Sequence, residues 1–165
     1  MAMISATFVA RLGLTLLLLL PACDGGEPSG DAPVLVFDPG GRAIEISVEV
    51  ADTPEKRQRG LMGREELPED AGMVFLHDQP VTSGFWMKDT LIPLSVAFWD
   101  RSETIGAILD MDPCEADPCT VYSPGISWVG AVEVNRGFFE EHGIEVGTRV
   151  SLGGVSRPED RAPSA

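Results

Sequence analysis

The chain has 165 residues, of which 44% are hydrophobic, and its 12 Lys and Arg residues stand against 26 Asp and Glu residues. This length fits one globular domain, and the net charge of −14 opposes the phosphate contacts that supply most affinity for nucleic acid. We therefore exclude nucleic acid as the main partner, and the many aliphatic residues exclude disorder over most of the length.

Residues 1–22 have the features of an export signal. Arg11 is the one charged residue in this segment, and it precedes an apolar run from Leu12 to Leu20. A transmembrane helix needs about 20 apolar residues, whereas a positive residue before about 7 to 15 apolar residues is typical of a secretory signal peptide. The following Leu20-Pro21-Ala22-Cys23 resembles the lipobox of bacterial lipoproteins, in which the cysteine is lipidated and becomes the first mature residue. A plain signal peptide cut after Ala22, or a buried apolar helix, is the alternative.

We accordingly expect an exported protein, anchored to the bacterial cell envelope by lipid on Cys23 and facing the periplasm or the exterior. The membrane is then a partner through that lipid. Residues 23–33 are rich in Gly, Pro and Asp and have no apolar period, so they are predicted to be a flexible tether. The domain is expected over residues 34–152, and a disordered tail over residues 153–165.

The domain is predicted to be mainly β. Hydrophobic and polar residues alternate in 42–50, which indicates a half-buried strand. Asp52-Thr53-Pro54-Glu55 then offers a helix cap, a proline for the first helical position and an acid in the first turn, so a short helix is predicted to about Met62, with Gly63 as its stop. Further strands are expected at 73–76, 84–87, 94–99, 104–111, 120–122, 128–134 and 149–152, and a second short helix at 137–142.

Short strands at this spacing leave little room for crossover helices. They favour an antiparallel sandwich or barrel with one or two short helices over a parallel sheet. Cys114 and Cys119 lie in one predicted loop, and export makes a disulfide between them the leading interpretation. A redox pair is the alternative, but the spacing is not Cys-x-x-Cys and the neighbouring acids disfavour a thiolate.

Several motifs resemble those of the DUF192 family, a domain family of unknown function in bacteria and archaea. They occur in order as 57-RQRGLMGR-64, 72-GMVF-75, 85-FWMKDT-90, 93-PL-94 and 133-EVNRG-137. The resemblance implies a compact, mainly β domain of sandwich or barrel type with short helices, and it implies no established reaction. The family usually has Asn where this chain has Asp89, and Asp where this chain has Ser95.

A basic cluster is the leading candidate site. Lys56, Arg57, Arg59 and Arg64 lie within nine residues of an otherwise acidic chain. We hypothesise that Arg57 and Arg64, together with Lys88, line a pocket that binds a carboxylate, a phosphate or an acidic sugar through charged hydrogen bonds. The alternative is structural: these cations pair with the domain's own acids, including Glu133, or compensate the helix dipole.

Trp86 is a second candidate, because an exposed indole would form a platform for a sugar ring, but a buried core tryptophan is the favoured interpretation. The ligand candidates are thus Arg57, Arg64, Trp86, Lys88, Asp89 and Glu133. Known catalytic motifs are absent from the sequence, and His77 and His142 are interpreted as surface or turn residues. No cofactor is predicted.

These features favour a binding or accessory domain for an anionic or carbohydrate envelope ligand, and they disfavour an enzyme. The first alternative is a small enzyme that acts on an envelope polysaccharide, with the basic residues and acids such as Asp89 or Glu133 around a cleft. The second is copper handling by Met62, Met73, Met87 and Met111 beside His77, for which core packing of the methionines on aromatic rings is the competing interpretation.

Overall fold

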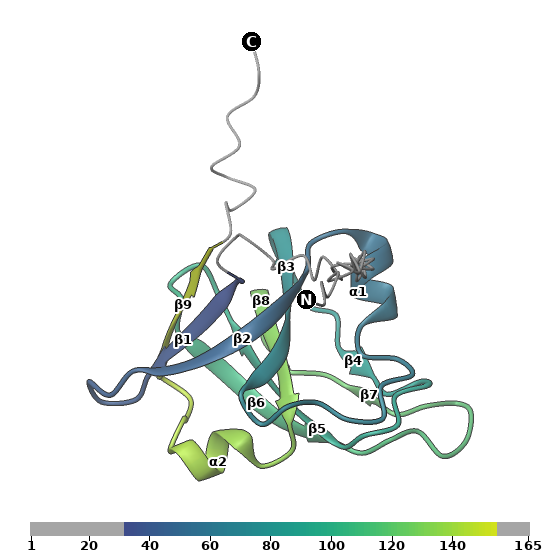
Figure 1. Ribbon diagram of the computed structural model, residues 1–165. Helices are drawn as coiled ribbons and strands as arrows, with labels where there is room; N and C mark the ends of the chain where they lie inside the picture. Colours follow the sequence, from purple (N-terminus) through teal and green to yellow (C-terminus); the bar gives the residue numbers. More distant parts are fainter. Residues whose placement is uncertain (1–31, 155–165) are drawn as a thin grey trace, which may run out of the picture.

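The computed structural model describes residues 32–154, which form a curled, mainly β domain with two short helices (Figure 1). The predicted signal peptide, Cys23, nearly all of the tether and most of the tail lie outside the described residues. The elements are β1 (Val34–Asp38), β2 (Ile44–Ala51), α1 (Pro54–Arg59), β3 (Ala71–Val81), β4 (Phe85–Trp86), β5 (Leu94–Trp99), β6 (Ile105–Met111), β7 (Val121–Tyr122), β8 (Trp128–Asn135), α2 (Phe138–His142) and β9 (Arg149–Gly153).

Seven strands form one sheet in the order β6-β5-β8-β3-β2-β1-β9, and β4 pairs with β7 in a separate ribbon. The sheet curls so that its two edges, at β6 and β9, approach each other. Thr104, just before β6, forms an isolated antiparallel bridge with Arg149 of β9. The predicted mainly β, barrel-like fold is therefore confirmed. One pairing differs from the antiparallel expectation: β2 and β3 run parallel, since α1 and the segment after it return the chain to the same end of the sheet.

The sheet has two packed faces. The concave face holds a core that includes Phe37, Val132 and Val150, and α2 adds Phe138 and Phe139 to it. The convex face of β3, β5 and β8 holds a second core, which is covered by residues after α1 and by the β4–β7 ribbon. Because both faces are covered, all six residues of β5 are buried.

Most predicted elements are found, with changed bounds. The helix predicted to reach Met62 ends at Arg59, because Gly60 leaves the helical conformation at φ 47°. The strand predicted at 73–76 extends to Val81, and β1 forms where the sequence indicated only the start of the domain. The half-buried strand within 42–50 is confirmed, since Ile46 and Val48 are buried while Glu45, Ser47 and Glu49 are exposed.

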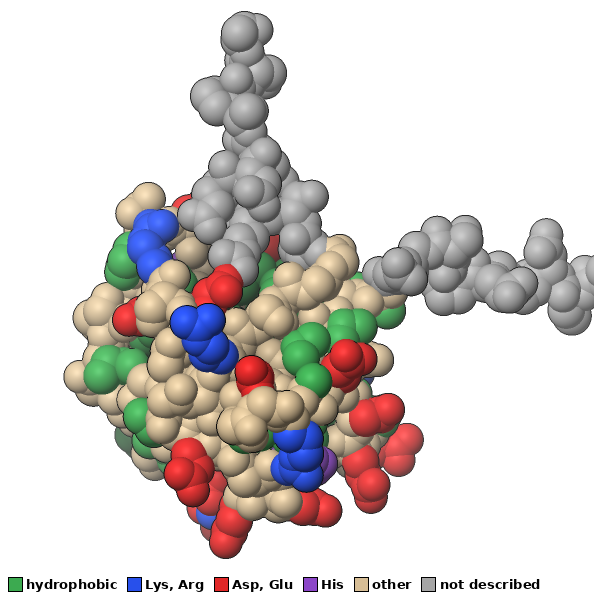
Figure 2. Space-filling view, turned by 90° about the vertical axis from the view of Figure 1, so that its left-hand side faces the viewer, with side chains coloured by type: hydrophobic (Ala, Val, Ile, Leu, Met, Phe, Trp, Pro, Cys, Tyr) green, Lys and Arg blue, Asp and Glu red, His purple; other side chains and the backbone are tan. Residues whose placement is uncertain are grey.

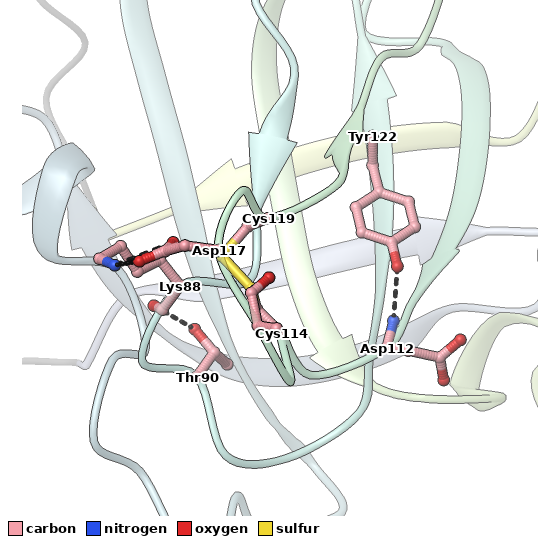
Figure 3. The surroundings of a disulfide bond; sticks show 8 residues. Lys88, Thr90, Asp112, Cys114, Asp117, Cys119 and Tyr122 are labelled. Atoms are coloured by element: carbon pink, nitrogen blue, oxygen red, sulfur yellow. Dashed lines mark hydrogen bonds and ion pairs between the residues drawn. A yellow bond between two sulfur atoms is a disulfide. The ribbon is translucent and has the colours of Figure 1, made fainter.

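The predicted disulfide is present between Cys114 and Cys119 in the loop that joins β6 to β7 (Figure 3). Tyr122 of β7 holds this loop from the other side, since its hydroxyl accepts a hydrogen bond from the backbone N–H of Asp112 at 3.1 Å. The loop therefore packs beside the ribbon on the convex side of the sheet. Over residues 32–154, no helix has the length and apolar character needed to cross a membrane.

Candidate functional site

A row of neighbouring residues crosses the convex face of the sheet and contains two acids. Glu49 of β2 pairs in register with Met73 of β3, which pairs with Glu133 of β8, which pairs with Val96 of β5. Residues directly opposite on neighbouring strands point to the same side of a sheet. Glu133 is thus placed among the apolar side chains of the convex core, and it is only 5% exposed.

The carboxyl group of Glu133 has no hydrogen-bond or ion-pair partner within residues 32–154. Burial raises its pKa to about 8, because an apolar surrounding disfavours the charged form. The group therefore carries a proton at neutral pH and is able to donate a hydrogen bond. It keeps a small contact with solvent, since no fully enclosed side-chain N or O atom in the described part of the chain lacks a partner.

Gly60 lies close to this carboxyl group. A Cβ atom added at Gly60 would lie 3.9 Å from Oε2 of Glu133 and 3.5 Å from the ring of Phe75. The backbone at Gly60 has φ 47° and ψ −137°, a conformation that residues with a side chain rarely adopt. The end of α1 thus approaches the buried acid through backbone alone, and no side chain at position 60 separates them.

Next to Gly60 is a hollow of about 310 Å³. Its lining includes Glu49 and Met73 from the row described above, and three basic side chains from α1 and the segment after it, Lys56, Arg59 and Arg64. Met73 and Gly60 both line the hollow and both adjoin Glu133. The buried acid thus lies behind two residues that line a hollow with a basic rim, which we call the α1 hollow, and it is not itself part of the lining.

The sequence of α1 explains this basic rim. Thr53 caps the helix by accepting a hydrogen bond from the backbone N–H of Lys56, and Pro54 occupies the first turn. The helix has six residues, so its basic residues fall in the last turn, where the carbonyl ends favour positive charge. Lys56 pairs with Asp52 at 2.9 Å and Arg64 pairs with Glu49. Arg59 has no hydrogen-bond or ion-pair partner among the described residues, so its guanidinium group is available to a ligand.

Comparison with known proteins identifies the family of this chain. The model of DUF192, described as an uncharacterised group, matches residues 35–152. The chain belongs to the DUF192 family. No curated protein matches it. Among solved structures, a Sinorhizobium meliloti 1021 protein provisionally described as a transcription regulator is 27% identical, with a TM-score of 0.68 over 76% of this chain and 98% of that chain. A protein of unknown function from Novosphingobium aromaticivorans DSM 12444 is 26% identical, with a TM-score of 0.64 over 76% of this chain and 89% of that chain.

The DUF192 domain brings two of the predicted site residues to the α1 hollow and separates a third from it. Arg64 lines the hollow, and Glu133 adjoins it. Arg57 points elsewhere, since its guanidinium group donates a hydrogen bond to the backbone carbonyl of Leu76 at 2.8 Å. Lys56 and Arg59, which the sequence placed in the basic cluster but not among the ligand candidates, line the hollow instead.

The other three candidates lie around the ribbon. Trp86 is 46% exposed and pairs with Val121, so the buried-core interpretation that the sequence favoured for this residue is wrong. Lys88 points toward Asp117 beside the disulfide, with an ion pair at 2.9 Å that raises the lysine pKa (Figure 3). Asp89 has a left-handed backbone at φ 55°, and its carbonyl accepts a hydrogen bond from Gly63.

The remaining sequence candidates have structural contacts. The ring of His77 meets Trp128 edge-on at 5.0 Å, and its pKa is lowered by desolvation and then by Arg57. His142 stacks on Phe138 at the end of α2. Met73, Met87 and Met111 are buried in the convex core, as the packing interpretation expects. In the described part of the chain, the one cluster of potential metal ligands is Cys114, Asp117 and Cys119, whose sulfurs are joined as a disulfide.

The buried hydroxyl of Ser95 contacts a carboxylate on the neighbouring strand. Asp110 lies directly opposite on β6 and accepts a hydrogen bond from the Ser95 hydroxyl at 2.5 Å. The same hydroxyl accepts a hydrogen bond from the backbone N–H of Gly137 at 3.1 Å. Both partners of this buried hydroxyl thus come from the domain itself.

Proposed function

We propose that this DUF192 domain is a non-catalytic binding domain of the bacterial cell envelope that holds an oxyanion in the α1 hollow. The observation that carries the proposal is the buried acid without a partner, Glu133, behind the lining of a hollow whose rim holds the unpaired Arg59. A buried polar group without a partner costs folding free energy, and such groups are retained where they serve a ligand.

The chemistry of the hollow fits a carboxylate or a phosphate group. Arg59 offers paired N–H donors in the geometry that suits two oxygens of such a group. Arg64 and Lys56 are paired with Glu49 and Asp52, so their charges are largely compensated and Arg59 supplies the net positive charge of the hollow. Protonated Glu133 supplies a further donor behind the lining of the hollow, where an ionised acid would instead repel the ligand.

The cell-envelope location rests on the lipobox that ends at Cys23, together with the preceding apolar run. The description of the Sinorhizobium protein as a regulator is not extended to this chain, because 26 acidic residues against 12 basic ones oppose binding to nucleic acid. Substitution Cys23→Ala is expected to move the protein from the membrane fraction to the soluble fraction of cells. Unchanged fractionation would contradict the lipid anchor.

Calorimetric titration tests the binding site. The purified protein is titrated with galacturonate, galactose and inorganic phosphate. We expect galacturonate or phosphate to bind and galactose not to bind. Loss of a charged hydrogen bond costs about 1.5 to 3 kcal/mol, so Arg59→Gln should weaken binding by about 10- to 100-fold.

The matched control is Arg149→Gln on β9, an exposed arginine away from the hollow, which should leave the affinity unchanged. Binding of phosphate without galacturonate would assign the site to a phosphate group, and the reverse result would assign it to an acidic sugar. Equal binding of galactose, or full affinity in Arg59→Gln, would contradict the proposed site.

A second candidate function is hydrolysis of an envelope polysaccharide, and the row of acids favours it. Glu133 and Glu49 lie two strands apart on one face, which places their backbones about 10 Å apart at the usual strand spacing. Inverting glycosidases use one protonated and one ionised carboxyl group about 6.5 to 9.5 Å apart. Release of reducing sugar from envelope glycan by the purified protein, and its loss in Glu133→Gln, would replace the binding function by this one.

A further inference from the structure

A second cavity lies on the other face of the sheet, at one end of the curl. It has a volume of about 230 Å³, and β1, β3, β5, β8 and β9 all contribute to its wall. The apolar part of the wall consists of Leu35, Leu76, Trp99, Val129, Val150 and Leu152. We call this cavity the barrel cup, and none of its lining residues lines the α1 hollow.

The barrel cup is formed by the closure of the sheet. Beside the Thr104–Arg149 bridge, the backbone N–H of Val150 donates to the carbonyl of Glu103 at 2.8 Å, and that of Ile105 donates to the carbonyl of Thr148 at 2.9 Å. These bonds join the two ends of the sheet along one side of the cup. Mouths of β-barrels are common sites for small ligands.

Trp99 gives the cup a fixed aromatic wall. The indole is 5% exposed and packs on Gly130, where an added Cβ atom would lie 2.2 Å from the ring. Gly130 is therefore required for the indole to lie flat against β8. An apolar cavity of about 150 Å³ is large enough to bind benzene, so the cup has room for an aromatic ring with a short side chain.

The rim of the cup is acidic. Its charged side chains are three acids, Asp78, Asp100 and Glu103, and one arginine, Arg101, whose guanidinium group donates a hydrogen bond to the backbone carbonyl of Asp78 at 3.0 Å. The carboxylate of Asp100 accepts hydrogen bonds from the backbone and hydroxyl of Ser102, whereas the carboxylate of Asp78 accepts none within residues 32–154. An anionic ligand is disfavoured at such a rim, and a positively charged one is attracted.

We propose that the barrel cup is a second binding site, which takes a small apolar amine with its ring against Trp99 and its ammonium group at the Asp78 carboxylate. This proposal does not depend on the α1 hollow. It predicts selectivity by charge among ligands of one shape, because the apolar wall accepts them all and the rim favours only the cation.

The test is calorimetric titration of the purified protein with phenethylamine, 2-phenylethanol and 3-phenylpropanoate. We expect phenethylamine to bind at least about fivefold more tightly than the alcohol, and 3-phenylpropanoate to bind least. Asp78→Asn should reduce the affinity for phenethylamine to that for the alcohol. Asp70→Asn, an exposed aspartate at the other end of β3, is the matched control and should change nothing.

Val129→Phe fills the cup and should abolish binding of all three compounds, while an unchanged circular dichroism spectrum shows that the variant folds. Three results would overturn the proposal: equal affinity for amine and alcohol, tighter binding of 3-phenylpropanoate, or binding that survives Val129→Phe. Loss of phenethylamine binding in Arg59→Gln would also overturn it, since that result would place the amine in the α1 hollow.

Discussion

Ser95 and Glu133 are the polar side chains that the described strands bury, one on each face of the sheet. On the concave side, the Ser95 hydroxyl donates to Asp110 and accepts from Gly137, so both of its hydrogen-bonding roles are met. On the convex side, Glu133 meets Met73, Val96 and the backbone of Gly60, and it has no partner within residues 32–154.

This difference separates a polar group that stabilises the fold from one that lowers its stability. A buried hydroxyl with two partners contributes to stability and fixes the position of α2. A buried acid without a partner lowers stability, because it must stay protonated or be charged in an apolar surrounding. This cost is the reason why we propose that Glu133 serves a ligand in the α1 hollow.

The largest expected effect is that of Glu133→Gln on the pH dependence of stability. The ordinary pKa of 4.5 applies to the unfolded chain and about 8 to the folded one, so the native state binds the extra proton between these values. Stability is then full below about pH 4.5 and falls as the pH rises to about 8. The variant should be more stable than the parent by on the order of 4 kcal/mol at pH 9, measured by urea unfolding.

The control for this experiment is Glu45→Gln, which removes an exposed acid from β2. It should retain the pH dependence of the parent protein. A parent protein whose stability is constant from pH 5 to pH 9 would show that Glu133 is ionised throughout, and the contrast between the two faces would disappear.

The second-largest expected effect concerns the disulfide-closed loop beside the ribbon on the convex face, and it is an effect on the free energy of unfolding. The disulfide closes a short loop, and the chain-entropy relation gives about 2 kcal/mol for a loop of this length. Replacing both Cys114 and Cys119 by Ser should lower the free energy of unfolding by about that amount. Hydrogen exchange should increase in the loop and in the β4–β7 ribbon and remain unchanged in β1 and β9. Faster exchange throughout the sheet would show that the loop supports the whole fold.

A smaller effect is expected for Ser95→Ala. This substitution leaves the N–H of Gly137 and the carboxylate of Asp110 without their shared partner, which should destabilise the protein by about 1 to 2 kcal/mol. The loss should be similar at pH 6 and pH 8, in contrast to the effect at Glu133. Thermal unfolding at both pH values measures this loss. A neutral or stabilising result would mean that the hydrogen bonds of the Ser95 hydroxyl do not stabilise the fold.

Local patterns in the sequence predicted much of the fold. The alternation around Ile46, the cap at Thr53 and the breakers between short strands locate most elements, because these signals act within a few residues. The parallel pairing of β2 with β3 and the end of α1 at Gly60 were not predicted. Both depend on how the segment after α1 packs on the sheet, and such long-range packing cannot be inferred from local sequence patterns.

The candidate site was predicted in part. The concentration of basic residues identified α1, but a helix of six residues turns Arg57 toward Leu76 and Arg59 toward the hollow, and spacing alone does not distinguish them. Glu133 was a ligand candidate from the sequence, and the structural alternative paired it with the basic residues, whereas the structure leaves its carboxyl group without a partner within residues 32–154. Its meeting with Gly60 joins residues 73 positions apart in sequence, which only the fold reveals.

The proposed site requires Glu133 to be uncharged at neutral pH beside the α1 hollow. Its protonation can be followed by a pH titration of its side-chain carboxyl carbon by NMR, assigned by comparison with Glu133→Gln. We expect a midpoint near pH 8, because burial raises this pKa to about 8. A midpoint near the ordinary value of 4.5 would contradict the proposed site, since the group would then be an ionised acid in contact with water and no donor for an anionic ligand.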